Sequence, residues 1–214
     1  VKTRLENQRQ IKADAVWIAD CIKFIKQSTP AISDDRLVET VLTHFLTTDF
    51  NESKCNESTL PSGISQMSNE LLSGQFLLQI DEVVNIGESI FQQRLQQVDH
   101  IQRPENLPQF VDSKNRTLKF NLTDGTQRIF GFEYKMIPQI HNKVLPGCKI
   151  RVRDVWIRRG MLLLTPESVE ILGGQSQSLL NAQMAYLEKF KQTNGKMDKN
   201  AAPKPTNNNA TNTN

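Results

Sequence analysis

The stretch from residue 118 to residue 134, LKFNLTDGTQRIFGFEY, constrains the fold more than any other part of the chain. Leu118, Phe120 and Leu122 alternate with polar residues, and this period of two is typical of a half-buried β-strand. A second apolar run follows the pair Asp124-Gly125, which favours a tight hairpin because glycine adopts positive φ without steric cost. The stretch therefore predicts two antiparallel strands, over residues 116–122 and 126–134.

Further strands are predicted on both sides of this hairpin. Residues 75–84 place Phe76, Leu78 and Ile80 on one face, and KIRVRDVWI and MLLL also have strand character. The segment PESVEILGG is predicted to end as a short strand. Five short antiparallel strands within about 100 residues indicate a small barrel or sandwich.

The segment KIRVRDVWI changes the face of its apolar residues midway. Ile150 and Val152 share one face, and then Val155 and Ile157 take it over. One extra residue produces such a change of phase, so we predict a β-bulge near Arg153-Asp154.

Helical spacing dominates the part of the chain before these strands. In DAVWIADCIKFIKQ, residues 14–27, the apolar residues recur every three or four positions, which predicts a helix with one buried stripe. A second helix is predicted to follow a cap at Ser33 or Asp34, with Leu37, Val41 and Phe45 in one row. Two such helices with a short connection pack as a small helical unit. The apolar stripe of SQSLLNAQMAYLEKF predicts a helix that closes the fold.

Composition divides the chain into three parts. Residues 51–63 are polar and rich in turn residues, so we place a boundary there between a helical unit, residues 1–62, and a strand-rich domain, residues 63–190. Residues 191–214 contain almost nothing that could be buried, and we expect a disordered, Asn-rich tail. No apolar run approaches membrane-spanning length and no secretory signal is recognisable, so we expect no membrane association.

A long polar segment separates the first two predicted strands. Residues 91–116 are too long and too polar for a hairpin, and loops of this length in compact domains are usually functional or disordered. The apolar residues within it either pack back onto the barrel or anchor a partner and become ordered on binding. We interpret residues 94–116 as an insertion loop whose candidate partner-binding residues are Arg103, Leu107, Pro108, Phe110 and Val111.

The sequence contains no catalytic constellation. Its three cysteines are too far apart for a disulfide framework or a zinc site. His44 sits among apolar residues of a helix, where a structural role is the more common one, and the other two histidines have no Cys or Glu at ligand spacing. Neither a phosphate-binding glycine motif nor a serine-nucleophile motif occurs. We therefore expect no enzyme activity, no metal and no cofactor.

A run of cations marks the strand-rich domain. Lys149, Arg151 and Arg153 alternate with apolar residues and are predicted to project from one face of a strand, and Arg158 and Arg159 follow in the next turn. This surface is either a solvated sheet face or one that binds a partner or the phosphates of nucleic acid. The net charge of +3 is too small to decide between them.

Aromatic platforms for single-stranded nucleic acid are not expected beside these cations. Aromatic residues make up only 7% of the chain. Phe120, Phe130 and Phe132 share the parity of positions that face the core, whereas a single-strand binder exposes its aromatics.

Several motifs, taken in order, resemble one known family. They are WIADCIKFI in the first predicted helix and then LTDG, GFEYKMIP, LPGCKI and GMLLLTPESVEILGG. Over most of residues 14–190 they resemble the RecQ-mediated genome instability protein 1 family. The resemblance implies an α+β fold, with an N-terminal three-helix unit, a five-stranded antiparallel OB-fold barrel, a long insertion loop and a C-terminal helix.

The resemblance also implies a function. Members of the family are not catalytic; they bind a type IA topoisomerase, topoisomerase III, and work with a RecQ-type helicase. Together these proteins dissolve double Holliday junctions without crossover, so we expect a nuclear protein of DNA repair, replication and homologous recombination. The insertion loop of the family contacts the topoisomerase, which implies that role for residues 94–116. Lys149, in LPGCKI, is implied as a contact on the barrel surface.

Two other interpretations stay open. One is an OB-fold module that binds single-stranded nucleic acid through the basic strand, and a weak direct contact with DNA is left open in either case. The other is the tudor-type partner of topoisomerase III beta, which shares this layout, although WIADCIKFI and GFEYKMIPQI favour the genome-instability family. Larger members carry a second, C-terminal OB-fold, and whether this chain is a fragment of such a protein is left open.

Overall fold

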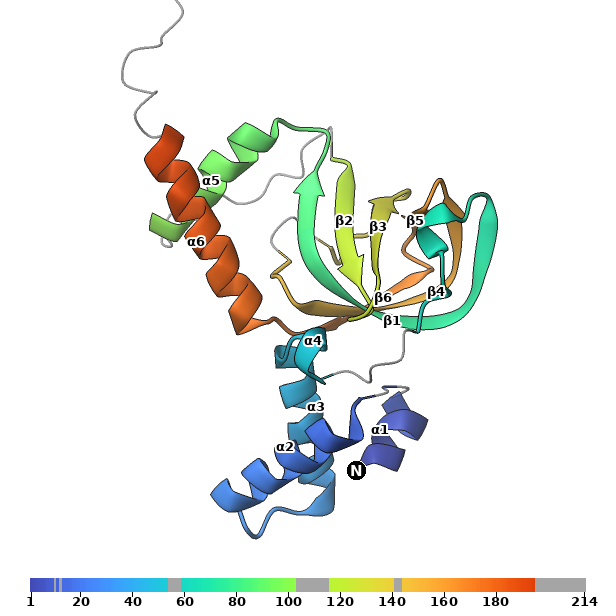
Figure 1. Cartoon of the computed structure of the whole chain (residues 1–214), viewed down its shortest axis with the longest axis vertical. Coiled ribbons are helices and arrows are strands. Elements are labelled where there is room, and N and C mark those ends of the chain that lie inside the picture. Colours follow the sequence, from blue (N-terminus) through green and yellow to red (C-terminus); the bar gives the residue numbers. More distant parts are fainter. Residues whose placement is uncertain (10, 12, 54–58, 103–115, 141–143, 195–214) are drawn as a thin grey trace, which may run out of the picture.

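The computed structural model describes residues 1–9, 11, 13–53, 59–102, 116–140 and 144–194. A helical unit comes first in the chain, and a barrel with two accompanying helices lies against it (Figure 1). The predicted fold class is confirmed: a helical N-terminus, a closed five-stranded barrel and a C-terminal helix.

Three helices and a short fourth one build the N-terminal unit: α1 Lys2–Arg9, α2 Ala15–Ser28, α3 Asp34–Thr47 and α4 Phe50–Ser53. Asp14 caps α2, because its carboxylate accepts the backbone N–H groups of Val16 at 2.7 Å and Trp17 at 3.0 Å. The predicted apolar stripes of α2 and α3 meet in one core, in which Val41 and Phe45 are completely buried. This core, rather than helix propensity, stabilises such short helices.

Six strands form one sheet: β1 Glu70–Asn85, β2 Leu118–Thr123, β3 Arg128–Glu133, β4 Cys148–Arg158, β5 Met161–Leu164 and β6 Val169–Gly173. Their order is β1-β2-β3-β5-β4-β6, and β1 also pairs with β4, so the first five strands close into a ring. The pair β3 and β5 is parallel, and the other pairs are antiparallel. A short 3₁₀ helix, η1 Ile64–Gln66, precedes β1.

The predicted irregularity in the fourth strand is confirmed. The pairing of β1 with β4 shifts register between Leu72 and Gln75, opposite the segment in which the buried face of β4 changes from Val152 to Val155. Asp154 adopts a φ of 43° there, and its carboxylate accepts the backbone N–H of Gly74 at 2.8 Å. The bend lets two long strands curve around the barrel and still stay paired.

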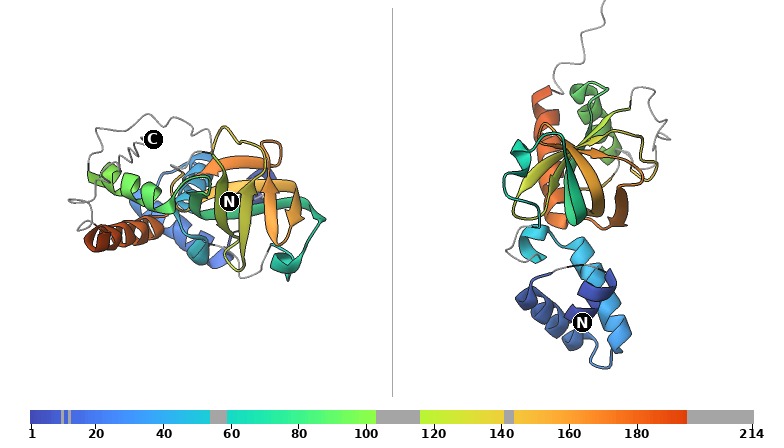
Figure 2. Two further views of the ribbon diagram at one scale, coloured as in Figure 1. Left: turned by 90° about the horizontal axis from the view of Figure 1, so that it is seen from above. Right: turned by 90° about the vertical axis from the view of Figure 1, so that its right-hand side faces the viewer.

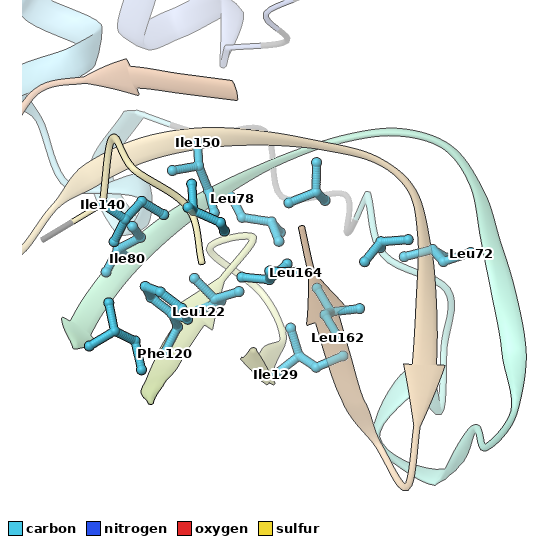
Figure 3. Packing of buried hydrophobic residues seen from close by; sticks show 14 of the residues in the cluster. Leu72, Leu78, Ile80, Phe120, Leu122, Ile129, Ile140, Ile150, Leu162 and Leu164 are labelled. Atoms are coloured by element: carbon cyan, nitrogen blue, oxygen red, sulfur yellow. The ribbon is translucent and has the colours of Figure 1, made fainter. Parts of the chain in front are cut away.

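Apolar side chains from every strand of the ring fill the barrel (Figure 3). Phe120, Ile150 and Leu162 are completely buried, and burial of each such side chain contributes about 1.5–3 kcal/mol. Gly131 occupies one inward position, where an added Cβ would lie 3.0 Å from the side chains of Leu122 and Leu164. A larger residue there would require the ends of these two leucine side chains to move.

The segment predicted as an insertion loop begins with a helix, which corrects the sequence interpretation. Residues Ile90–Gln102 form α5, which packs against α6, Gln177–Asn194 (Figure 2). The rings of Phe91 and Phe190 lie 5.5 Å apart, and the guanidinium of Arg94 lies 5.3 Å from the ring centre of Tyr186. The helix was missed because most of its other residues are polar. Its apolar residues do have helical spacing: Phe91, Leu95 and Val98.

The Asp124-Gly125 turn, which the sequence predicted, also fastens the linker between the two units. Gly125 has a φ of 86°. One carboxylate oxygen of the buried Asp124 accepts the backbone N–H groups of Thr126 and Gln127, at 2.9 and 2.8 Å. The other oxygen accepts those of Thr59 and Leu60, at 2.9 and 3.0 Å. One carboxylate thus holds both the hairpin and the chain that enters the barrel.

Across the described residues, the helices lack the combination of length and apolar character that a membrane crossing requires.

Substitution of Asp124 by alanine is expected to lower the free energy of unfolding by about 3 kcal/mol, because four backbone N–H groups lose their acceptor. Urea denaturation measures this change. Asp20→Ala, at an exposed position of α2, serves as the control and should stay within about 0.5 kcal/mol of the parent. A loss below about 1 kcal/mol for Asp124→Ala would contradict the role of this carboxylate.

Candidate partner-binding site

The five candidate residues of the insertion loop lie outside the described residues, and the structure places the chain on either side of them. These five are Arg103, Leu107, Pro108, Phe110 and Val111. On the N-terminal side, α5 ends at Gln102 and is held by its packing on α6. On the C-terminal side, the described chain resumes at Arg116, two residues before β2.

Arg116 is fastened by a buried ion pair. Its guanidinium contacts both carboxylate oxygens of Glu133, at 3.1 and 2.5 Å, and also donates to the carbonyl oxygens of Ile137 and Ile140. Only 8% of the Arg116 side chain and 3% of the Glu133 side chain are exposed. Removal of one partner from such a pair leaves an uncompensated buried charge. No sequence signal identified this pair, because the assignment of Phe130 and Phe132 to the core placed Glu133 on the outside, whereas the structure buries it.

Lys149 is not on the barrel surface, which corrects the prediction. It is completely buried. Its Nζ donates to the carbonyl oxygens of Thr48 at 2.6 Å and Gly147 at 2.7 Å, and to Oε1 of Gln79 at 2.9 Å. Strand alternation gives the side on which a residue lies, but it does not reveal that the end of α3 packs over that side.

A buried polar network surrounds this lysine. Oε1 of Gln79 also accepts the backbone N–H of Phe50 at 3.0 Å, and its Nε2 donates to Asp49 at 3.3 Å and to Asp81 at 2.9 Å. Burial lowers the pKa of Lys149 to about 8, although the negative charges of Asp49 and Asp81 act in the opposite direction. Burial also raises the pKa of Asp81. The network joins the helical unit to β1 and β4.

Arg151 and Arg153 come together on a single carboxylate. Their guanidinium groups donate to Oε2 of Glu170 on β6, at 2.7 and 2.8 Å. Burial acts to raise the pKa of Glu170, but the hydrogen bonds from Arg153 and Arg151 outweigh it and lower this pKa below the ordinary value. The predicted row of three outward cations is therefore an internal lysine and two arginines that share a partner.

Arg158 and Arg159 lie at the far end of β4, away from this group. Both are exposed in the turn that leads to β5. Arg159 has a φ of 48°, and its backbone N–H donates to Oγ of Ser68 at 3.3 Å. The five cations singled out in the sequence therefore do not form one surface.

Two phenylalanines face the opposite way from the prediction. Phe120 is buried in the barrel core, but Phe130 is exposed and Phe132 is half-buried, whereas Ile129 and Gly131 face inward. Gly131 takes an inward position of β3, close to the side chains of Leu122 and Leu164, and the large rings take the outward positions. Aromatic side chains are thus presented on the outside of the barrel.

Comparisons with known proteins agree with this architecture. A family model for the "RMI1, N-terminal helical domain" matches residues 5–53, and one for the "RMI1, N-terminal OB-fold domain" matches residues 60–186. The chain is 32% identical over 206 residues to RecQ-mediated genome instability protein 1 of Oryza sativa subsp. japonica, covering 92% of the chain and 23% of the relative. It is 34% identical over 176 residues to the Arabidopsis thaliana protein of the same name, covering 81% of the chain and 25% of the relative. The chain thus spans about a quarter of the length of these relatives.

A weaker similarity links the chain to the tudor-type relative. It is 27% identical over 125 residues to Tudor domain-containing protein 3 of Danio rerio, which covers 58% of the chain.

Substitution of Lys149 by alanine is expected to lower the free energy of unfolding by about 3 kcal/mol, because three buried oxygens lose their donor. Urea denaturation is followed by the fluorescence of Trp17, in a Trp156→Phe background, so that the signal reports the helical unit. Arg153→Ala, which removes a cation from a surface ion pair, is the control and should cost at most about 1 kcal/mol. Equal losses for the two variants would mean that Lys149 has no special role in joining the units.

The buried lysine also predicts a pH dependence of stability. The pKa of Lys149 is about 8 in the folded protein and about 10.4 in the unfolded chain. Between these values the unfolded chain holds more protons, so the contribution of Lys149 to the free energy of unfolding rises with pH; below about pH 8 it is constant. As the pH rises through this range, the parent should therefore gain free energy of unfolding relative to Lys149→Met, by up to about 1.4 kcal/mol per pH unit. Urea denaturation from about pH 7 to about pH 10 measures it, and a flat or falling difference would contradict the assignment.

Proposed function

The chain belongs to the RMI1 family, and we propose that it is a non-catalytic subunit that binds a type IA topoisomerase, topoisomerase III, in a complex with a RecQ-type helicase. In this role it promotes the dissolution of double Holliday junctions in the nucleus, limits crossover and maintains genome stability. The observation that carries the proposal is the match to both domains of the family, in order and along most of the described chain.

The use of the buried polar groups supports a binding role. Buried charged groups are candidates for the reactive groups of a catalytic site, and the candidates considered are Asp124, Glu133 and Lys149. Each of them is instead saturated by backbone and side-chain partners that fix the fold. These three buried charged groups therefore position elements of the barrel.

The geometry around the insertion loop supports the choice of contact surface. The loop departs from α5, which packs on α6, and returns at Arg116, which is held by Glu133. Both described ends of the segment are thus fixed on the barrel, and fixing the ends of a binding segment lowers the entropic cost of binding. A loop that binds one state of the topoisomerase gate more tightly than another shifts the equilibrium between those states. A difference of about 1.4 kcal/mol changes their ratio tenfold.

Similarity over a larger share of the chain favours the role of a genome-instability protein over that of the tudor-type relative. The matches to the genome-instability proteins of the two plants cover 92% and 81% of the chain, whereas the tudor-type match covers 58%. The topoisomerase of the genome-instability complex is therefore the partner to test first.

Size-exclusion chromatography of the chain with a topoisomerase III catalytic core, at moderate salt and without DNA, tests the proposal. We expect co-elution as a stoichiometric complex. Replacement of residues 103–115 by a short Gly-Ser linker leaves every described helix and strand intact, and it should abolish stimulation of decatenation by the topoisomerase. A matched Gly-Ser replacement of residues 195–207 should not change this stimulation. Separate elution of the intact chain and the topoisomerase would refute the proposal.

A further inference from the structure

One buried side chain joins the two ends of the insertion between β1 and β2, which we define as residues 86–117. Asn85 is the last residue of β1, and only 3% of it is exposed. Its Oδ1 accepts the backbone N–H of Gly87 at 3.1 Å and that of Thr117, 32 positions from Asn85, at 2.8 Å. A single oxygen therefore holds a residue near the start of the insertion and the residue that ends it.

The backbone closes the base of the insertion as well. Asn85 pairs with Leu118 at the end of the antiparallel ladder of β1 and β2. The N–H of Ile86 donates to the carbonyl oxygen of Thr117 at 2.8 Å. The end of β1 and the start of β2 therefore lie side by side (Figure 1). The side-chain bonds of Asn85 strengthen this ladder at the point where the chain leaves and re-enters the barrel.

A second amide fixes the first turn of α5 at the same place. Oε1 of Gln93 accepts the backbone N–H of Asn85 at 3.0 Å, and its Nε2 donates to the carbonyl oxygens of Asn85 at 2.6 Å and Glu88 at 3.2 Å. The oxygen of an amide can only accept and its nitrogen can only donate, so one orientation of Gln93 satisfies all these bonds. The direction in which α5 leaves the barrel is therefore set by Asn85 and Gln93, which we call the amide pair.

The amide pair is not part of the barrel core. Neither residue belongs to the cluster of apolar side chains that fills the barrel. Apolar residues at these positions would shield the strand end without defining a direction, whereas polar groups that are fully paired specify one arrangement. The amide pair thus adds orientation to a helix that α6 already holds through the contact of Phe91 with Phe190.

We propose that Asn85 and Gln93 are positioning residues for the binding of topoisomerase III, an inference that rests on the proposed function. They set the direction in which the insertion leaves and re-enters the barrel, and they act through the insertion rather than by contact with the topoisomerase. A binding segment whose base is already oriented loses less conformational entropy when the complex forms. Loss of this orientation is expected mainly as faster dissociation, because closely related complexes differ more in dissociation rate than in association rate.

Two amide-to-acid substitutions have opposite expected results. The Asn85 side chain acts as an acceptor toward Gly87 and Thr117, so Asn85→Asp keeps these bonds and Asn85→Ala removes them. Nε2 of Gln93 is a donor, so Gln93→Glu places an oxygen against two carbonyl oxygens. Surface plasmon resonance on an immobilised topoisomerase III catalytic core measures the dissociation rate of each variant. We expect Asn85→Ala and Gln93→Glu to dissociate about fivefold faster or more, and Asn85→Asp to dissociate at nearly the rate of the parent.

Gln92→Ala is the matched control, because Gln92 is the exposed neighbour of Gln93 on α5. It should dissociate at the rate of the parent. Hydrogen exchange of the free chain separates positioning from a general loss of stability. In Asn85→Ala the amides of Gly87 and Thr117 should exchange faster, whereas the amides in the middle of β2 should exchange as they do in the parent.

The possible results separate the positioning role from the proposed function. Dissociation of Asn85→Ala and Gln93→Glu at the rate of the parent would overturn the positioning role and leave the proposed function standing. Equal losses in the two acid variants would overturn it too. Faster exchange throughout the barrel strands would have the same meaning, since dissociation would then report stability alone. A parent chain that does not bind the topoisomerase refutes the proposed function, and the positioning role falls with it.

Discussion

The ammonium group of Lys149 is the interaction on which the relation between the helical unit and the barrel depends. It joins β4 to the carbonyl oxygen of Thr48, which is 101 residues away in the sequence. A charge is costly to bury, and it is retained here because three oxygen acceptors surround it and two carboxylates lie nearby. The same contacts fix Gln79, and through Gln79 the start of α4. This polar centre fixes the chain between α3 and α4 on the barrel.

The strand pattern was readable from the sequence because the pleat imposes a period of two on any half-buried strand. The hairpin at Asp124-Gly125 and the change of phase in β4 were predicted for that reason and are present in the structure. The helices α2 and α3 were predicted because their apolar stripes are dense. Helix α5 was missed because its stripe is sparse and its remaining positions are polar.

The direction of side chains was predicted less well, since alternation defines two faces without saying which one is inside. Phe130 and Phe132 were assigned to the core because they are apolar, yet Gly131 packs inward against two leucine side chains and the rings lie on the outside. Lys149 was assigned to the solvent because it is charged, yet the helical unit covers it. In both cases the deciding factor was the packing of another element, which local sequence does not contain. The candidate residues of the insertion loop stay predictions, and the Arg116–Glu133 pair beside them emerged only from the structure.

The pairing of β1 with β4 has a consequence for the order in which the molecule assembles. Glu70 pairs with Ile157, so the ring cannot close until nearly the whole strand-forming sequence has been synthesised. Contacts between residues so distant in sequence form late, because the intervening chain must first be brought together at an entropic cost. Helices α1 to α3 have their own apolar core and leave the ribosome first. The N-terminal unit therefore has to wait for β4 before it can dock. A nascent chain that stops short of Lys149 would carry a folded helical unit with no barrel to hold it.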